Sequence, residues 1–152
     1  MTRRQRLILT AAILGSSVAA IDGTIVNVAL PSIERDLGGG LAAQQWISNG
    51  YLLTLGSLLL IGGSLGDIYG ERRIFSVGLL AFGIFSIACA AAPTIGVLLV
   101  ARAFQGAAAA LLVPSSLAVI VAAFSRSERG KAIGAWTAWG AIATIIGPLA
   151  GG

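Results

Sequence analysis

No histidine and a single cysteine, Cys89, occur in this chain of 152 residues, and only 11% of the residues are charged. Without histidine, zinc sites and histidine-based acid–base catalysis lose their usual side chain. One cysteine can form neither an intrachain disulfide nor a thiolate metal cluster. Soluble domains carry about 25% charged residues. The low charge, together with a hydrophobic content of 57%, therefore excludes both an ordinary soluble domain and a disordered chain.

Long apolar stretches are present instead. A transmembrane helix needs about 20 apolar residues to cross the ~30 Å hydrocarbon core of a bilayer, and each stretch comes close to that length or exceeds it. The stretches are too long for strands and lack the alternation of a membrane barrel. The sequence predicts an all-α integral membrane protein whose five transmembrane helices occupy approximately residues 7–30, 43–65, 74–92, 95–124 and 132–152.

The basic residues lie almost entirely in the connections between these stretches. Connections before the first, after the second and after the fourth stretch hold Arg3, Arg4, Arg6, Arg72, Arg73, Arg126, Arg129 and Lys131. The other connections hold only Arg35. Because short loops rich in Lys and Arg stay cytoplasmic, we expect a multi-pass protein of the cell membrane with its N-terminus in the cytoplasm. The net charge of +4 then reflects orientation and contact with the lipid bilayer, and no nucleic-acid partner is expected.

Two ionisable residues, Asp22 and Arg102, fall well inside an apolar stretch. At about 1.5 Å per helical residue, both lie at comparable heights in the outer half of the membrane. A charge at this depth is costly, so it usually faces a partner or a wet cavity. Gln105 shares the helix face of Arg102. We expect these three residues to line a cavity, and a purely structural role is the alternative. Trp46 and Tyr51 are expected at the outer membrane interface, where amphipathic rings concentrate.

Four motifs occur along the chain, each on a different element. The first helix carries Asp22-Gly-Thr24-Ile-Val-Asn27-Val-Ala-Leu-Pro31. The connection between the second and third helices carries Gly63-Ser-Leu-Gly-Asp67-Ile-Tyr-Gly70-Glu-Arg72-Arg73. The fourth helix carries Arg102-Ala-Phe-Gln105-Gly106, and the fifth carries Gly134 and Gly147-Pro148-Leu-Ala-Gly151-Gly152. In this order they resemble the motifs of the major facilitator superfamily, and specifically its fourteen-helix EmrB/QacA-type branch of drug:proton antiporters. Ile68 and Glu71 stand where the family usually has basic residues.

The resemblance implies a transporter that works by alternating access, with protons as the coupling ion and with no metal or other cofactor. Asp22 would carry the proton, while Arg102 and Gln105 would tune it. The loop motif, through Asp67, would latch the two halves of the transporter together. The fifth-helix motif would pack against the second half. The substrate would be a small lipophilic or cationic molecule.

The resemblance covers only the first five helices of that architecture. We therefore expect residues 1–152 to be the partial N-terminal half of a transporter, inactive without the missing C-terminal half. Two alternatives remain open: an uptake carrier of the same superfamily for a metabolite or sugar, and a membrane scaffold or regulatory fragment that transports nothing. An enzyme is not expected, because no nucleophile–base arrangement and no phosphate-binding loop occur in the sequence.

Overall fold

The computed structural model describes residues 1–151, with side chains described for residues 1–149. The described chain forms five helices and no strand, and all five are long and apolar enough to cross a membrane, as predicted. They extend beyond most of the predicted apolar stretches, although the third and fourth end slightly earlier than expected. Their bounds are α1 (Arg3–Leu37), α2 (Gly40–Tyr69), α3 (Glu71–Ala90), α4 (Ile95–Ala123) and α5 (Arg126–Gly151).

Capping residues and glycines set the ends of α1. The hydroxyl of Thr2 accepts a hydrogen bond from the N–H of Gln5 at 3.2 Å, and the side chain of Gln5 accepts one from the N–H of Thr2 at 2.7 Å. This capping box satisfies two N–H groups at the helix start. After α1, Gly38, Gly39 and Gly40 have φ angles of 69°, 103° and 68°. Side chains rarely tolerate these angles, so the glycines allow the chain to reverse sharply into α2.

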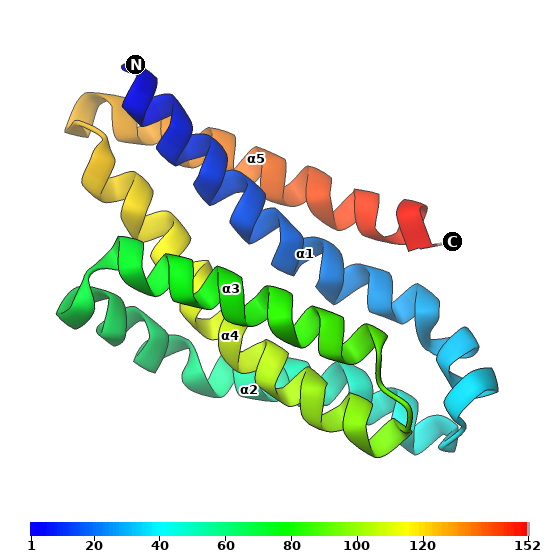
Figure 1. Ribbon diagram of the computed structural model, residues 1–152. Helices are drawn as coiled ribbons and strands as arrows, with labels where there is room; N and C mark the ends of the chain where they lie inside the picture. Colours follow the sequence, from blue (N-terminus) through cyan, green and yellow to red (C-terminus); the bar gives the residue numbers. More distant parts are fainter. Residues whose placement is uncertain (152) are drawn as a thin grey trace.

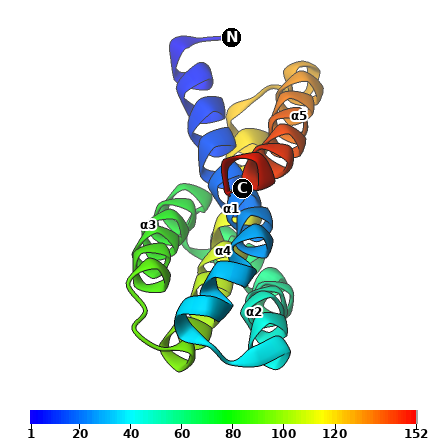
Figure 2. The same cartoon turned by 90° about the vertical axis from the view of Figure 1, so that its right-hand side faces the viewer.

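α4 is the central helix of the bundle. About half of its most apolar window is buried against other helices, compared with 17–22% for the corresponding windows of the other four. Figures 1 and 2 show α4 between α2 and α3, with α1 running beside α5. The largest interfaces are those of α4 with α2, of α4 with α3, and of α1 with α5. The smaller α1–α4 interface connects the two groups of helices.

Small residues allow α4 to approach its neighbours closely. A Cβ atom on Gly62 of α2 would overlap the carbonyl oxygen of Ala110, and one on Gly78 of α3 would lie 2.9 Å from a backbone nitrogen of α4. A Cβ on Gly106 of α4 would overlap the carbonyl oxygen of Tyr51. Within a membrane, such close backbone contact contributes much of the attraction between helices. Glycine at these positions therefore determines how tightly α2, α3 and α4 pack.

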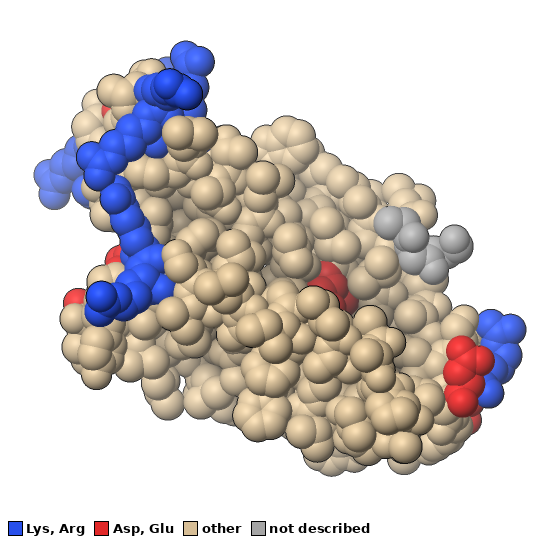
Figure 3. Space-filling model, in the orientation of Figure 1, with Lys and Arg blue, Asp and Glu red and all other residues tan. Residues whose placement is uncertain are grey.

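Charged side chains lie mainly at the two ends of the bundle. Figure 3 shows most Lys and Arg atoms at the end that carries the N-terminus, and a smaller charged group at the opposite end. Acidic atoms are also visible in a recess in the otherwise uncharged middle. The uncharged belt between the two ends matches the hydrocarbon layer that the long helices are able to cross.

Candidate functional site

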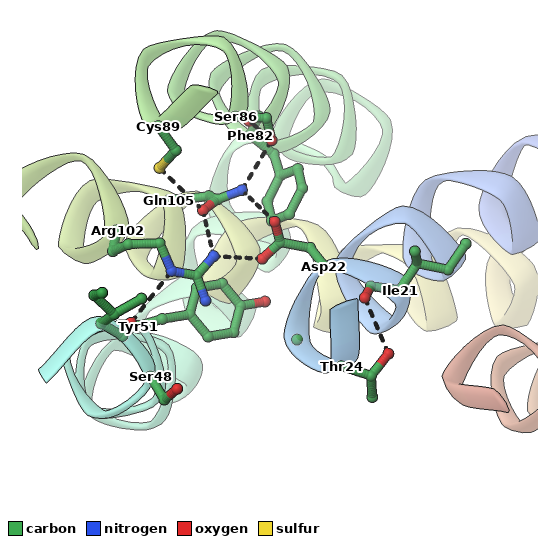
Figure 4. A network of polar contacts seen from close by, with 12 residues as sticks. Ile21, Asp22, Thr24, Ser48, Tyr51, Phe82, Ser86, Cys89, Arg102 and Gln105 are labelled. Atoms are coloured by element: carbon green, nitrogen blue, oxygen red, sulfur yellow. Dashed lines mark hydrogen bonds and ion pairs between the residues drawn. The ribbon is translucent and has the colours of Figure 1, made fainter. Parts of the chain in front are cut away.

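Two opposite charges meet inside the bundle. Asp22 lies near the middle of α1, and Arg102 lies in the first half of α4. Nη1 of Arg102 donates a hydrogen bond to Oδ2 of Asp22 at 2.5 Å (Figure 4). The side chain of Arg102 is 2% exposed, and that of Asp22 is 20% exposed. The structure therefore brings together the two ionisable residues that the sequence places at similar depth, and each supplies the partner that a buried charge requires.

Gln105 completes the contact between α4 and Asp22. It follows Arg102 by nearly one helical turn, so both side chains project from the same face. Its Nε2 donates to Oδ1 of Asp22 at 2.9 Å, and its Oε1 accepts from Nη1 of Arg102 at 2.6 Å. Gln105 is fully buried. Both oxygens of the Asp22 carboxylate are thus held by donors from α4.

α3 adds two side chains to this network. Oγ of Ser86 accepts a hydrogen bond from Nε2 of Gln105 at 2.8 Å and donates one to the carbonyl of Phe82 at 2.8 Å. Sγ of Cys89 donates to Oε1 of Gln105 at 3.5 Å. Gln105 therefore uses both amide hydrogens and receives two donors at its oxygen, which satisfies a buried amide.

α2 supports the guanidinium from another direction. Nε of Arg102 donates to the backbone carbonyl of Ile47 at 3.3 Å, and Cζ of Arg102 lies 4.4 Å from the centre of the Tyr51 ring. An aromatic face attracts a cation at this distance. The two aromatic residues that the sequence predicts at the outer membrane interface differ in burial: Tyr51 is 3% exposed, whereas Trp46 is 56% exposed. Packing against the guanidinium accounts for the burial of Tyr51.

The network as it stands fits an ionised Asp22. Both oxygens of Asp22 face N–H donors, one from Arg102 and one from Gln105. A neutral carboxyl would lose its ionic attraction to Arg102, and its O–H would meet donors where it needs an acceptor. Adding a proton therefore weakens the contact between α1 and α4. This arrangement can convert protonation into a change in helix packing.

Two cavities lie beside the network and share no lining residue. One, of about 380 Å³, is lined by Asp22, Arg102 and Cys89 among others. The other, of about 510 Å³, lies between α1, α2, α4 and α5, and we call it the aromatic cavity. The side chains that define the aromatic cavity include Thr24, Tyr51, Leu55, Val113, Trp136 and Thr137. Tyr51 therefore both borders the aromatic cavity and packs against Arg102.

The other first-helix motif residues contact different neighbours. Thr24 donates to backbone carbonyls of its own helix and faces α5. The side-chain oxygen of Asn27 accepts a hydrogen bond from Ser48 of α2 at 3.3 Å. Pro31 is exposed within α1. Because positions 22, 24 and 27 point in different directions around a helix, this motif lets α1 contact α4, α5 and α2.

The loop motif forms the connection between α2 and α3. Gly70 is the only residue between these helices and has a φ of 94°, which requires glycine in so short a turn. A Cβ on Gly63 would meet no atom within 4 Å, so Gly63 permits no close helix contact among the described residues. It faces open space on the surface of α2.

The charged residues of the loop motif lie mainly on the surface of the bundle. Arg72 and Arg73 are exposed at the start of α3, and no ion pair joins either of them to Asp67 within the described side chains. The carboxylate of Glu71 packs against Gly66 in the last turn of α2 instead.

The fifth-helix motif has one buried position among its described side chains. Gly147 is buried, and a Cβ there would overlap a hydroxyl oxygen of α1. Gly147 thus contributes to the contact between α5 and α1, while packing of the motif against a second half of a transporter stays a prediction. Gly134 and Pro148 are exposed. Gly151 ends α5, and Gly152 lies outside the described residues.

Sequence reasoning missed three members of the network: Tyr51, Ser86 and Cys89. A serine in an apolar helix usually bonds back to its own helix, and Ser86 does this as well. Spacing alone therefore does not distinguish Ser86 from Ser76, which makes the same kind of bond to Arg72. Only the packing of α3 on α4 reveals which serine reaches Gln105.

Comparison with known families is consistent with this geometry. The model of the Major Facilitator Superfamily matches residues 12–152 of the chain. The chain belongs to this superfamily of membrane transporters. Its five apolar helices are accordingly those of a multi-pass membrane protein.

Curated relatives carry names that refer to drug resistance and export. The puromycin resistance protein of Streptomyces alboniger is 48% identical over 136 residues, which are 89% of this chain and 27% of that protein. The multidrug resistance protein Stp of Mycobacterium tuberculosis is 42% identical over 153 aligned positions, which cover 100% of this chain and 28% of that protein. The tetracenomycin C resistance and export protein of Streptomyces glaucescens is 39% identical over 144 residues, which cover 95% of this chain and 27% of that protein. The chain thus spans just over a quarter of the length of these relatives.

Proposed function

We propose that the protein containing this chain exports small lipophilic molecules across the cell membrane in exchange for protons, by alternating access. The main support is the buried contact between Asp22 and Arg102, because it makes the α1–α4 interface sensitive to a proton. The names of its relatives support export over uptake. This activity moves molecules and alters no covalent bond.

Asp22 is proposed to exchange the coupling proton, while Arg102 and Gln105 bind its ionised form. When Asp22 is ionised, α4 holds α1 through charge-assisted hydrogen bonds, which are stronger than neutral ones. When Asp22 is protonated, these bonds weaken and α1 is released from α4. The proton would therefore favour the conformation in which α1 and α4 are apart. A ligand shifts a conformational equilibrium only if it binds the two conformations with different affinities.

The aromatic cavity is proposed to form part of the substrate site. Its volume of about 510 Å³ lies within the usual range for small-molecule sites. Apolar and aromatic side chains dominate its lining, with the threonine hydroxyls as neutral polar groups. Such a surface favours a lipophilic molecule, and the rings of Tyr51 and Trp136 would also attract a cation.

The cytoplasmic side is proposed to be the end that carries the N-terminus. Most basic side chains gather at that end (Figure 3), and the positive-inside rule places such groups in the cytoplasm. Because the chain spans just over a quarter of its relatives, we propose that transport also requires a C-terminal half of the transporter. A substrate site between two halves is typical of such carriers.

Efflux from cells or vesicles carrying the full-length protein tests this proposal. Puromycin or a fluorescent lipophilic cation would serve as the probe, with and without an uncoupler that removes the proton gradient. Wild type should export the probe only when the gradient is present. Asp22→Asn should reduce proton-driven export at least 10-fold, because Asn cannot exchange the proton. Asp36→Asn is the matched control: this exposed acid of the same helix borders the same cavity as Asp22 but forms no hydrogen bond with the network among the described side chains, so the variant should retain export.

Three results would contradict the proposal. Normal proton-driven export by Asp22→Asn or by Arg102→Ala would remove the assigned roles of these residues. Probe accumulation driven by the gradient would indicate an uptake carrier. Wild-type protein that moves no probe in either direction would favour a membrane scaffold or regulatory role.

A further inference from the structure

The amide of Gln105 has two possible orientations, and they affect Asp22 in opposite ways. In the observed orientation, Nε2 donates to Oδ1 of Asp22, which favours an ionised carboxylate. If the amide turned over, its oxygen would face Asp22 and could accept a hydrogen bond from the O–H of a protonated carboxyl. Whatever fixes the amide therefore influences how readily Asp22 takes up a proton.

Ser86 is placed to fix this orientation from α3. Its hydroxyl donates to the carbonyl of Phe82 at 2.8 Å, so its oxygen is left to accept a hydrogen bond from Nε2 of Gln105 at 2.8 Å. Turning the amide would require Ser86 to give up the bond to Phe82 and donate to Gln105. Arg102 favours the same orientation, because its Nη1 donates to Oε1 of Gln105 at 2.6 Å. Ser86 therefore adds, from α3, to the stability of the orientation in which the amide N–H faces Asp22.

We propose that Ser86 is a positioning residue that orients Gln105 and thereby stabilises the ionised form of Asp22. The inference rests on the proposed function for its meaning in transport, since Asp22 is the proposed proton carrier. Through Ser86, α3 would then contribute to the coupling of protons to transport, although it supplies no charged group to the buried network.

Other titratable groups near Asp22 are accounted for by the geometry. Arg102 faces it from α4, Tyr51 lies beside Arg102 on α2, and Cys89 contacts Gln105 from α3. Asp36, further along α1, borders the same cavity as Asp22. The charged residues of α5 lie in its first two turns, at the end where the N-terminus of the chain contacts Glu128. None of these side chains is altered when Ser86 is replaced, so a change in the titration of Asp22 would report on the orientation of Gln105.

The test is a pH titration of Asp22 by infrared difference spectroscopy on the purified full-length protein. The signal is the carbonyl stretching band of a protonated carboxyl that disappears in Asp22→Asn. In Ser86→Ala, the midpoint should rise by about 0.7 pH unit, a five-fold change equal to about 1 kcal/mol, which is the lower end of the penalty for a buried donor without a partner.

Three further variants make the result specific. Ser86→Thr retains the hydroxyl and should titrate like wild type. Ser86→Cys retains a weaker acceptor and should lie between wild type and Ser86→Ala, which also provides a result if the alanine variant does not fold. Ser76→Ala removes the same type of bond on the same helix, away from Asp22, and should leave the midpoint unchanged.

A midpoint in Ser86→Ala or Ser86→Cys that equals the value for Ser76→Ala, or that moves to lower pH, overturns the inference. The titration requires no transport. Failure of wild-type protein to export a probe would therefore count against the proposed function while leaving the positioning role of Ser86 intact.

Discussion

α4 contacts α2 and α3 in a different way from α1. Towards α2 and α3 it presents mainly small residues and backbone, with Gly62, Gly78 and Gly106 in direct contact with a neighbouring main chain. The polar contacts of Arg102 and Gln105 on these two sides are with uncharged groups. Towards α1 the interface is smaller and contains the ion pair of Asp22 and Arg102. Close backbone packing does not respond to pH, whereas a carboxylate held by donors does. One side of α4 thus packs chiefly by shape, and the other side includes a contact between opposite charges.

Removal of Arg102 should have the largest effect on stability. Arg102→Ala leaves Asp22 buried without its partner, and breaking a buried pair in this way costs about 3–5 kcal/mol. Thermal unfolding of the full-length protein in detergent measures the loss. Arg102→Lys keeps the charge but lacks the planar fork that reaches several acceptors, so an intermediate loss is expected. Arg35→Ala, at an exposed position, is the control. An equal loss in the two alanine variants would mean that the α1–α4 contact contributes little.

Filling the contact between α2 and α4 should have a smaller effect that does not depend on pH. A Cβ in Gly62→Ala would overlap the carbonyl of Ala110, and overpacking of this kind costs about 1–3 kcal/mol. Gly56→Ala is the matched control, because a Cβ at that position on the same helix meets no atom within 4 Å. Unfolding temperatures measured at two pH values should show the same difference between the variants at both. A pH-dependent difference would contradict the separation of the two interfaces.

Loss of the Tyr51 ring should have the smallest effect of the three. Tyr51→Leu removes the aromatic face beneath Arg102, and a cation–π contact of this kind contributes about 1 kcal/mol. Tyr51→Phe keeps the ring and should be close to wild type in unfolding temperature. Equal stability of the leucine and phenylalanine variants would show that the ring fills space without attracting the guanidinium.

Much of the fold follows from the sequence in a simple way. Apolar stretches of about 20 residues in a chain with few charges leave helices across a membrane as the stable solution. The ends of the helices were harder to predict. α1 and α2 extend beyond their apolar stretches into polar residues, whose helical conformation depends on capping and local contacts. Gly38, Gly39 and Gly40 mark one such end by their positive φ angles.

The candidate site was predictable only for its charged members. Asp22 and Arg102 stand out because a charge inside an apolar stretch is rare and costly. Ser86 and Tyr51 carry no such signal, since serines bond to their own helix and tyrosines favour membrane interfaces. Gly147 illustrates the same limit: its motif is visible in the sequence, but its contact with α1 depends on how α5 is packed.

The membrane-spanning helices and the similar depth of an acid and an arginine could be predicted before any packing was known, because hydropathy and helical rise act along one segment at a time. The folded bundle was needed to see that both oxygens of Asp22 meet donors from α4, that Ser86 accepts a hydrogen bond from Gln105, and that the Tyr51 ring packs against Arg102. These contacts join residues from four helices, and their geometry depends on how closely and at what angle the helices pack.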